Sequence, residues 1–311
     1  MTESEKPVVS VVVLAYNVER YLPRALESIL MQRSPFPYEI VVGEDCSTDG
    51  TRKILISYAK REPHRFKLIF RERNIGMVPN FLDALNACAG TFVAVCDGDD
   101  YWTDPEKLRK QVDFLESHPG HGVVFTDADV YYEEEKKFVR AYDRRVRKTV
   151  PQGEVFSSLM YGSNPYRVST SMCRSSLLAE YKQTLTMRDF YVNDFPLWMS
   201  LARQSLVGYI PHSTAGYRIR SRSMSHFGTL EEIIRFRRSK YRICLFLAAL
   251  YGMKPDVKRL RRKYLRDVIG ECAKRKSLTM LRRYTGSLTL GIMIIARQYL
   301  VELAFSFKKE G

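Results

Sequence analysis

The stretch Cys96-Asp97-Gly98-Asp99-Asp100-Tyr101-Trp102 sets the interpretation of the whole chain. Residues 91–95 before it form a short apolar, β-branched run that predicts a buried strand. Residues 103–106 after it contain capping residues and a proline, which predict the start of a helix. Three carboxylates therefore crowd one tight turn, where their mutual repulsion favours a bound cation. The turn suits a hard divalent cation that also binds water and substrate phosphate, or it is a solvated acidic turn that caps the helix.

Strands and helices alternate over the first hundred residues. Apolar runs at residues 8–15, 38–42, 66–70 and 91–95 predict strands, and segments with apolar side chains at helical spacing separate them. This order predicts a mostly parallel sheet with helices on both faces, in which ligands bind at the carboxyl ends of the strands. Three of these strands end in polar turns: Tyr16-Asn17, Glu44-Asp45 and Asp97-Gly98-Asp99.

The first strand ends in Leu14-Ala15-Tyr16-Asn17-Val18-Glu19, which contains no Gly-x-Gly-x-x-Gly. A dinucleotide-binding Rossmann domain therefore lacks its phosphate-binding turn. The sequence also contains no Gly-Lys-Ser/Thr loop, which disfavours a P-loop phosphotransferase. A metal-dependent nucleotidyltransferase is an alternative, but it would need a basic phosphate-binding turn after the first strand, and this turn is not basic.

Four strings in this order resemble family 2 glycosyltransferases of the GT-A fold, of the bacterial cell-surface polysaccharide type, over roughly residues 7–226. They are Val11-Val12-Val13-Leu14-Ala15-Tyr16-Asn17, Glu44-Asp45-Cys46-Ser47-Thr48-Asp49-Gly50-Thr51, Asn74-Ile75-Gly76 and Asp97-Gly98-Asp99-Asp100. The resemblance implies a GT-A fold and a nucleotide-diphosphate sugar as donor, most simply of the UDP type.

The resemblance also assigns roles to the residues of the three polar turns. Ala15, Tyr16 and Asn17 would flank the nucleotide, and Asp45 would accept a hydrogen bond from the base. Glu44 stands where the family usually has Asp. Asp97, with Gly98, would lie at the ribose, and Asp99 would bind Mg²⁺ or Mn²⁺ on the diphosphate.

Asp194 is the candidate general base. It stands in Asn193-Asp194-Phe195-Pro196-Leu197-Trp198, where neighbouring aromatic side chains would remove water from its carboxylate and raise its basicity. It could also cap the helix that follows. Inverting members of the resembling family carry their base Asp in a matching position, so we expect Asp194 to take the proton of the acceptor hydroxyl.

A basic segment follows in Tyr217-Arg218-Ile219-Arg220-Ser221-Arg222-Ser223-Met224-Ser225-His226. Many relatives of the resembling family carry Tyr-Arg-x-His here, and Arg220 takes the place of that histidine. His226 could supply an imidazole ligand to the metal, or Arg218 and Arg220 could neutralise the departing diphosphate. A solvated basic loop is the alternative. Residues 133–150 are charged and indicate a loop over the site. Residues 169–174 resemble the segment of the family that lines the acceptor side, or they form a buried strand of small residues.

The net charge of +15 is concentrated near the C-terminus: residues 231–283 hold 17 Lys or Arg and five Asp or Glu. Such asymmetry predicts an anionic partner, either a membrane surface or a nucleic acid. Residues 287–307 are strongly apolar but contain Arg297 and Glu302, which favours a buried or interfacial helix over a spanning one. A helical pair that packs on the catalytic domain, or a contact between copies of the chain, is the plainer alternative.

The six cysteines show no metal-finger or CxxC spacing, and residues 1–6 lack the apolar core of a signal peptide, which predicts a cytoplasmic protein. We expect a GT-A catalytic domain at residues 1–228 and a basic and apolar helical extension at 229–311. The expected activity is inverting, hexosyltransferase-like transfer to a saccharide or lipid-linked hydroxyl, with the enzyme peripheral at the inner face of the cell membrane. A basic nucleic-acid-binding protein is the competing class, but it leaves the acidic turns unexplained because carboxylates repel phosphate.

Overall fold

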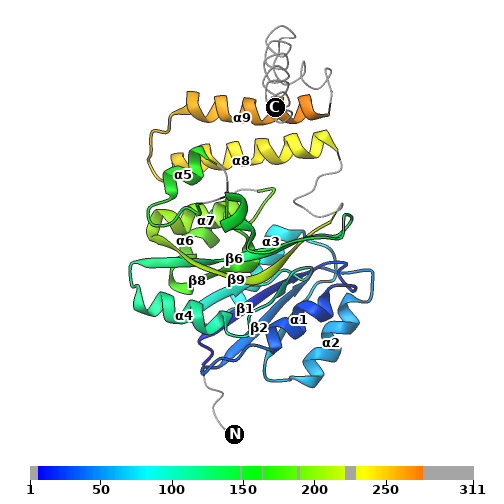
Figure 1. Ribbon diagram of the computed structural model, residues 1–311. Coiled ribbons are helices and arrows are strands. Elements are labelled where there is room, and N and C mark those ends of the chain that lie inside the picture. Colours follow the sequence, from blue (N-terminus) through cyan, green and yellow to red (C-terminus); the bar gives the residue numbers. More distant parts are fainter. Residues whose placement is uncertain (1–5, 148, 163, 188–189, 221–228, 276–311) are drawn as a thin grey trace, which may run out of the picture. The chain divides into compact units, whose positions relative to one another are not determined.

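The computed structural model describes residues 6–147, 149–162, 164–187, 190–220 and 229–275 (Figure 1). The chain divides into two compact units, Met1–Arg220 and Ser221–Gly311. The domain boundary expected after residue 228 lies at the end of 221–228, outside the described residues, and stays a prediction.

The first half of the first unit is a parallel sheet with the strand order β3-β2-β1-β4. Its strands are β1 (Val9–Ala15), β2 (Tyr38–Glu44), β3 (Phe66–Phe70) and β4 (Phe92–Val95). Almost every residue of β1, β2 and β4 is buried, which explains why these runs are continuously apolar instead of alternating. The four strands predicted from the sequence are confirmed.

Helices cover both faces of this sheet (Figure 1). A single buried cluster joins one face to α1 (Leu22–Leu30), α2 (Thr51–Arg61) and α4 (Lys107–Ser117). The helix α3 (Met77–Ala87) contacts β1 and β2, and its buried side chains lie outside that cluster, so α3 covers the other face.

The second half of the sheet has mixed strand directions. The strand β8 (Ser171–Arg174) runs antiparallel to β4 and to β6 (His121–Tyr132), and β6 runs parallel to β9 (Leu206–Ile219). Two short strands complete the described sheet: β5 (Tyr101–Trp102) pairs with β9, and β7 (Lys137–Val139) pairs with β6. The helices α5 (Phe156–Tyr161), α6 (Leu178–Met187) and α7 (Asp194–Gln204) belong to this half, where α7 packs against both α5 and α6.

Two local predictions were wrong. The helix expected to start within residues 103–106 begins at Lys107, because Asp104 forms a turn in which its carboxylate accepts the amide of Glu106 at 2.9 Å. Residues 133–150 are not a simple loop: they contain β7 and the single π-helical turn Asp143–Arg147.

The second unit contains α8 (Leu230–Leu250) and α9 (Val257–Lys274), packed on each other as an antiparallel pair. The capping box of Thr229 and Glu232 starts α8, and the carboxylate of Asp256 accepts the amide of Arg259 to start α9. In the part of the chain that the structure describes, none of the helices combines the length and apolarity that crossing a membrane requires. The apolar segment 287–307 lies outside the described residues.

All six cysteines are free thiols.

Candidate active site

The polar turns after β1 and β2 are joined by hydrogen bonds. Asn17 accepts the amide of Thr48 on its side-chain oxygen at 2.8 Å, and the amide of Asn17 donates to the hydroxyl of Ser47 at 3.0 Å. Asn17 has a φ of 51° and Cys46 a φ of 60°, so each turn contains a non-glycine residue in the left-handed region. Such strained positions persist where the surroundings hold them, and they often lie at functional sites. Beside them the ring of Tyr16 is 48% exposed and free to stack on a planar ligand.

The two carboxylates that end β2 are buried and already hold the chain. Glu44 accepts the guanidinium of Arg52 at 2.5 Å and the amide of Ser47 at 2.5 Å. Asp45 accepts the amide of Ile75 at 2.7 Å and that of Gly76 at 2.9 Å, which fixes the start of α3 against this turn. Contact with a nucleotide base would therefore use further lone pairs on the two carboxylate oxygens of Asp45 that already accept these amides. The contact stays a prediction.

The acidic turn after β4 is crowded with negative charge. Burial, followed by the neighbouring carboxylates of Asp99 and Asp194, raises the pKa of Asp97 to about 7. Asp100 is 3% exposed, and burial, then the charges of Asp99 and Asp97, raises its pKa well above the usual range. The turn thus holds more carboxylates close together than it can easily keep ionised.

Ser169 connects the acidic turn to the segment before β8. Its hydroxyl donates to Asp100 at 2.6 Å and accepts the amide of Asp97 at 3.3 Å. Its carbonyl accepts the indole N–H of Trp102 at 2.9 Å. Asp100 is therefore a structural member of the turn, whereas Asp97 and Asp99 are partly accessible.

Two arginines of the β9 end lie against the acidic turn. The backbone amide of Arg218 donates to Asp100 at 2.9 Å, and its Nε donates to the carbonyl of Asp99 at 3.1 Å. Its guanidinium lies over the rings of three tyrosines, 4.8 Å from the centroid of Tyr21 and within 6 Å of Tyr101 and Tyr131. Arg220 forms an ion pair with the carboxylate of Asp99 and also lies over Tyr21. The structure thus brings both predicted arginines to the acidic turn.

Asp194 is the first residue of α7, with Asn193 at the capping position. Its Oδ1 accepts the amide of Phe195 at 2.6 Å, and its Oδ2 accepts the side-chain amide of Asn164 at 3.0 Å. Its charge contributes to the raised pKa of Asp97, which places the expected base near the acidic turn although the two are far apart in sequence.

The donor set of the acidic turn fits a divalent cation. Asp97 and Asp99 offer hard carboxylate oxygens in a place where positive charge would stabilise the ionised forms, and Mg²⁺ or Mn²⁺ needs few protein ligands beside phosphate oxygens. Among the described residues, no group of three or more His, Cys, Asp or Glu side chains forms a complete metal site. His226, the expected imidazole ligand, lies outside the described residues.

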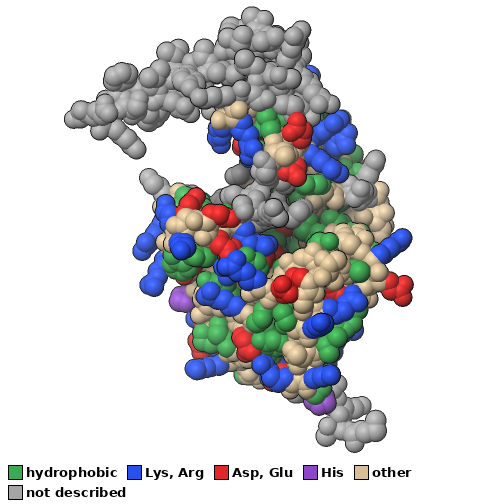
Figure 2. All heavy atoms as spheres, turned by 90° about the vertical axis from the view of Figure 1, so that its right-hand side faces the viewer, with side chains coloured by type: hydrophobic (Ala, Val, Ile, Leu, Met, Phe, Trp, Pro, Cys, Tyr) green, Lys and Arg blue, Asp and Glu red, His purple; other side chains and the backbone are tan. Residues whose placement is uncertain are grey.

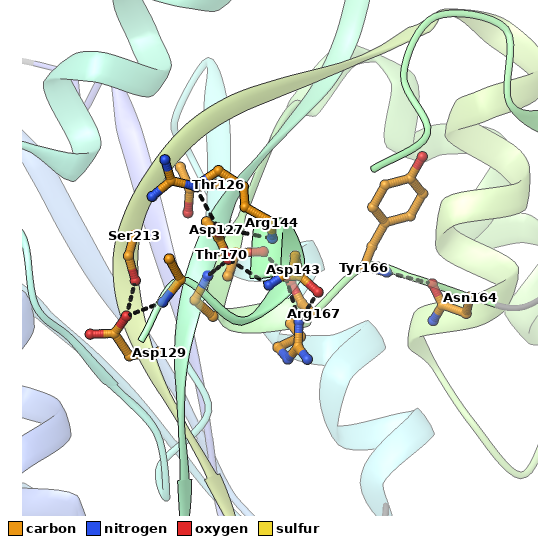
Figure 3. A network of polar contacts seen from close by, with 12 residues as sticks. Thr126, Asp127, Asp129, Asp143, Arg144, Asn164, Tyr166, Arg167, Thr170 and Ser213 are labelled. Atoms are coloured by element: carbon orange, nitrogen blue, oxygen red, sulfur yellow. Dashed lines mark hydrogen bonds and ion pairs between the residues drawn. The ribbon is translucent and has the colours of Figure 1, made fainter. Parts of the chain in front are cut away.

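A second polar network connects β6 to the π-helical turn (Figure 3). The fully buried carboxylate of Asp127 accepts the amide of Asp143 at 2.9 Å and the Nε of Arg144 at 2.9 Å. Asp143 in turn forms an ion pair with Arg167, with N–O distances of 2.5 and 2.7 Å. The charged segment that the sequence suggested as a loop over the site is held to the sheet by these pairs.

Sequence reasoning missed Asn164 and the tyrosines that surround Arg218. Asn164 shows only a weak signal in the sequence, an Asn before Pro165, which reads as a turn. Only the fold reveals these contacts, because the partners are distant in the sequence. Asn164 donates a hydrogen bond to Asp194, 30 positions away, and the guanidinium of Arg218 lies over the ring of Tyr21, 197 positions away.

Similarity to solved structures establishes the fold. The chain superposes on the mannosyltransferase PcManGT from Pyrobaculum calidifontis, solved with GDP-Man and Mn²⁺, with a TM-score of 0.60 at 18% identity, covering 96% of this chain and 81% of that one. S. aureus TarS (residues 1–349), solved with UDP-GlcNAc, gives 0.55 at 20% identity, covering 85% and 72%. The expected GT-A architecture is confirmed.

Sequence similarity establishes the family. An uncharacterized protein of Mycobacterium tuberculosis, Rv1520, is 46% identical over 128 residues, which are 41% of this chain and 37% of that protein. The Bacillus subtilis protein named "Putative glycosyltransferase EpsE" is 33% identical over 204 residues, 65% of this chain and 69% of its own length. The sequence profile described as Glycosyl transferase family 2 matches residues 10–181, more than half of the chain. The chain belongs to glycosyl transferase family 2.

Proposed function

We propose that this protein is an inverting glycosyltransferase that moves a sugar from a nucleotide-diphosphate donor to the hydroxyl of a saccharide or lipid-linked acceptor. The observation that carries the proposal is the meeting of carboxylates at Asp97, where burial, followed by the charges of Asp99 and Asp194, raises the pKa of Asp97 to about 7. A transferase of this class needs a place for a metal-bound diphosphate and a base for the acceptor, and these carboxylates can supply both.

The donor would lie at the carboxyl ends of β1, β2 and β4. Ala15, Tyr16 and Asn17 would flank the nucleotide, and the exposed ring of Tyr16 supports this because a planar base can stack on it. Asp45, beside Glu44, would contact the base, and Asp97 with Gly98 would lie at the ribose. The donors bound in the two similar solved structures, UDP-GlcNAc in TarS and GDP-Man in PcManGT, support a nucleotide sugar as substrate.

Asp99 would hold Mg²⁺ or Mn²⁺, with His226 as a second ligand. The metal, when bound, offsets the negative charge that builds on the leaving diphosphate. Arg218 and Arg220 would bind the diphosphate oxygens. Rings packed around the Arg218 guanidinium restrict its motion, so its charge is held in place before the donor binds.

Asp194 would accept the proton of the acceptor hydroxyl as the oxygen attacks the anomeric carbon. The glycosidic bond to the diphosphate breaks as the new one forms, so a single displacement inverts that carbon. The site then needs no second carboxylate as nucleophile. Inversion is the stereochemical outcome that this proposal predicts.

The experiment that tests the proposal is a donor panel. UDP- and GDP-sugars are incubated with the protein and Mg²⁺ or Mn²⁺, and released nucleoside diphosphate is measured with and without saccharide acceptors. Asp194→Asn should abolish transfer while nucleotide binding remains, whereas Asp99→Ala should weaken metal-dependent nucleotide binding. Full turnover by Asp194→Asn would remove Asp194 as the base.

Our proposal for the acceptor and the place of action rests on a different observation. The outer surfaces of α8 and α9 carry exposed arginines and lysines, and the whole chain is strongly basic. Figure 2 shows Lys and Arg side chains at many points of the described surface. A Bacillus subtilis relative named for teichuronic acid biosynthesis, TuaG, is 39% identical over 110 residues, 35% of this chain and 42% of that protein. These observations support a peripheral enzyme at the cytoplasmic face of the membrane that acts in surface polysaccharide assembly.

Family membership and the acidic site give the nucleic-acid-binding and nucleotidyltransferase alternatives no support.

A further inference from the structure

We propose that Asn164 is a positioning residue that orients the carboxylate of Asp194 for proton transfer. This inference rests on the proposed role of Asp194 as the base. Asn164 lies in the segment between α5 and β8, far along the sequence from every polar turn that the sequence analysis identified. It acts on the reaction only through Asp194.

The contact itself is direct. The side-chain amide of Asn164 donates to Oδ2 of Asp194 at 3.0 Å, while the backbone amide of Phe195 donates to Oδ1 at 2.6 Å. Two donors on different oxygens fix the plane of the carboxylate. A carboxylate oxygen can accept more than one hydrogen bond, so these two bonds do not by themselves prevent it from accepting the proton of an acceptor hydroxyl.

The orientation of the Asn164 amide is determined by a second hydrogen bond. The backbone N–H of Tyr166 donates to Oδ1 of Asn164 at 3.1 Å (Figure 3). A backbone amide can only donate, so the side-chain oxygen must face Tyr166. The NH₂ group therefore faces Asp194, and the pair works as donor and acceptor without ambiguity.

Both sides of this contact are anchored on one aromatic residue. The ring of Phe125 on β6 stacks on Tyr166, with centroids 4.1 Å apart and planes 10° apart. The same ring packs in a T-shaped arrangement with Trp198, on the helix that begins with Asp194, with the ring centroids 4.8 Å apart. The hydroxyl of Tyr166 also donates to the carbonyl of Pro151 at 2.8 Å. Asn164 and Asp194 are thus placed by a shared packing element.

A neutral donor suits this position. The carboxylate of Asp194 interacts electrostatically with that of Asp97, whose negative charge would repel an unrestrained carboxylate. Arginine or lysine in the place of Asn164 would hold Asp194 more strongly, but its charge would make the carboxylate a weaker base. An amide restrains the carboxylate while adding no charge.

The decisive variant is Asn164→Asp. It keeps the side-chain oxygen that accepts the amide of Tyr166, but it replaces the NH₂ donor with an oxygen that cannot donate to Asp194 when ionised. The assay measures nucleoside diphosphate released from UDP-GlcNAc or GDP-mannose, whichever the donor panel shows to be turned over. We expect kcat to fall about tenfold or more in Asn164→Asp and in Asn164→Ala, with the donor KM within about twofold of the unaltered protein.

Tyr166→Phe is the matched control. It removes the bond to Pro151 and so loosens the same segment, while the contact between Asn164 and Asp194 remains. We expect it to keep most of the activity, and thermal unfolding confirms that each variant is folded. A wild-type kcat for Asn164→Asp, together with an inactive Asp194→Asn, overturns the role of Asn164 and leaves the base in place. Full turnover by Asp194→Asn instead overturns the proposed base itself.

Discussion

The guanidinium of Arg220 forms an ion pair with the carboxylate of Asp99, the residue proposed to hold the metal. One oxygen of Asp99 therefore already has a cation beside it. A divalent cation and Arg220 compete for the same carboxylate until a diphosphate offers Arg220 a new partner.

The first prediction follows from this competition. Arg220→Gln should bind Mn²⁺ about tenfold more tightly than the unaltered protein when no nucleotide is present, because Asp99 then lacks the ion pair with Arg220. The same change should weaken binding of UDP or GDP in the presence of Mn²⁺, since one diphosphate contact is lost. Calorimetric titration of each ligand separates the two effects. Arg144→Gln is the control, because Arg144 pairs with Asp127 instead. Equal Mn²⁺ affinities for Arg220→Gln and the unaltered protein would contradict the competition.

The second prediction concerns the packing of the acidic turn. A Cβ at position 98 would lie 2.8 Å from the carbonyl oxygen of Leu14 and 3.1 Å from Cγ2 of Val18. Gly98→Ala should therefore lower the free energy of unfolding by about 1–3 kcal/mol, as overpacking does. Urea unfolding measures the loss. Gly120→Ala is the control, since its Cβ would meet only Leu206, at 3.7 Å. If both variants are as stable as the unaltered chain, the close approach of the turn to β1 is not as described.

The third prediction uses a buried lysine under the acidic turn. Lys107 is fully buried, its Nζ lies 4.4 Å from the centroid of Trp102, and burial lowers its pKa to about 7. In the unfolded chain the pKa returns to about 10.4. Between these values the unfolded state binds more protons, so this lysine makes the stability rise with pH from about 7 to about 10.

Lys107→Met keeps the length of the side chain and removes the titrating group. The Tm of the variant relative to that of the unaltered protein should be highest at pH 6.5 and should decrease towards pH 9.5, because the penalty of the buried charge disappears from the unaltered protein as pH rises. Thermal unfolding at three pH values measures the trend. Lys53→Met, at an exposed position of α2, should show no such trend. A difference that stays constant with pH would contradict the buried ammonium group.

The fourth prediction tests the membrane surface. Arg261, Arg262 and Arg266 are exposed on α9. Replacing all three with Gln should weaken binding to vesicles of anionic lipid at low salt by at least tenfold, at about 1 kcal/mol for each cation near the surface. Vesicle sedimentation measures the bound fraction. The control replaces three exposed cations of the first unit, Lys53, Lys60 and Arg73, and should bind as the unaltered protein does. If the unaltered protein ignores such vesicles, the basic helices serve packing or assembly instead.

The sequence predicted the parallel half of the sheet because its information is local. Each of β1, β2 and β4 is a run of buried apolar residues, and each polar turn follows its strand directly. Asp97 and Asp194 could be predicted as site residues for the same reason, since each lies in a short, contiguous motif. The two predicted arginines, Arg218 and Arg220, do reach the acidic turn.

What the sequence could not show depends on contacts between distant segments. The strand β5 has only two residues, and it forms because Tyr101 and Trp102 pair with Gly216 and Ala215. The strand β7 lies in a charged run with no apolar alternation, and pairing with the end of β6 alone defines it. The role we assign to Asn164 is of the same kind, because its partner is 30 residues away.

Ser169 has a consequence for exchanging parts between relatives. Its hydroxyl and its carbonyl bind both ends of the acidic turn, through Asp97, Asp100 and Trp102. Ser169 therefore connects the segment that would face the acceptor to the turn that would face the donor. A chimera that imports residues 164–174 from a relative with another acceptor must bring a hydroxyl to position 169. Without it, a change intended for acceptor choice would also disturb the donor, and the two specificities could not be altered independently.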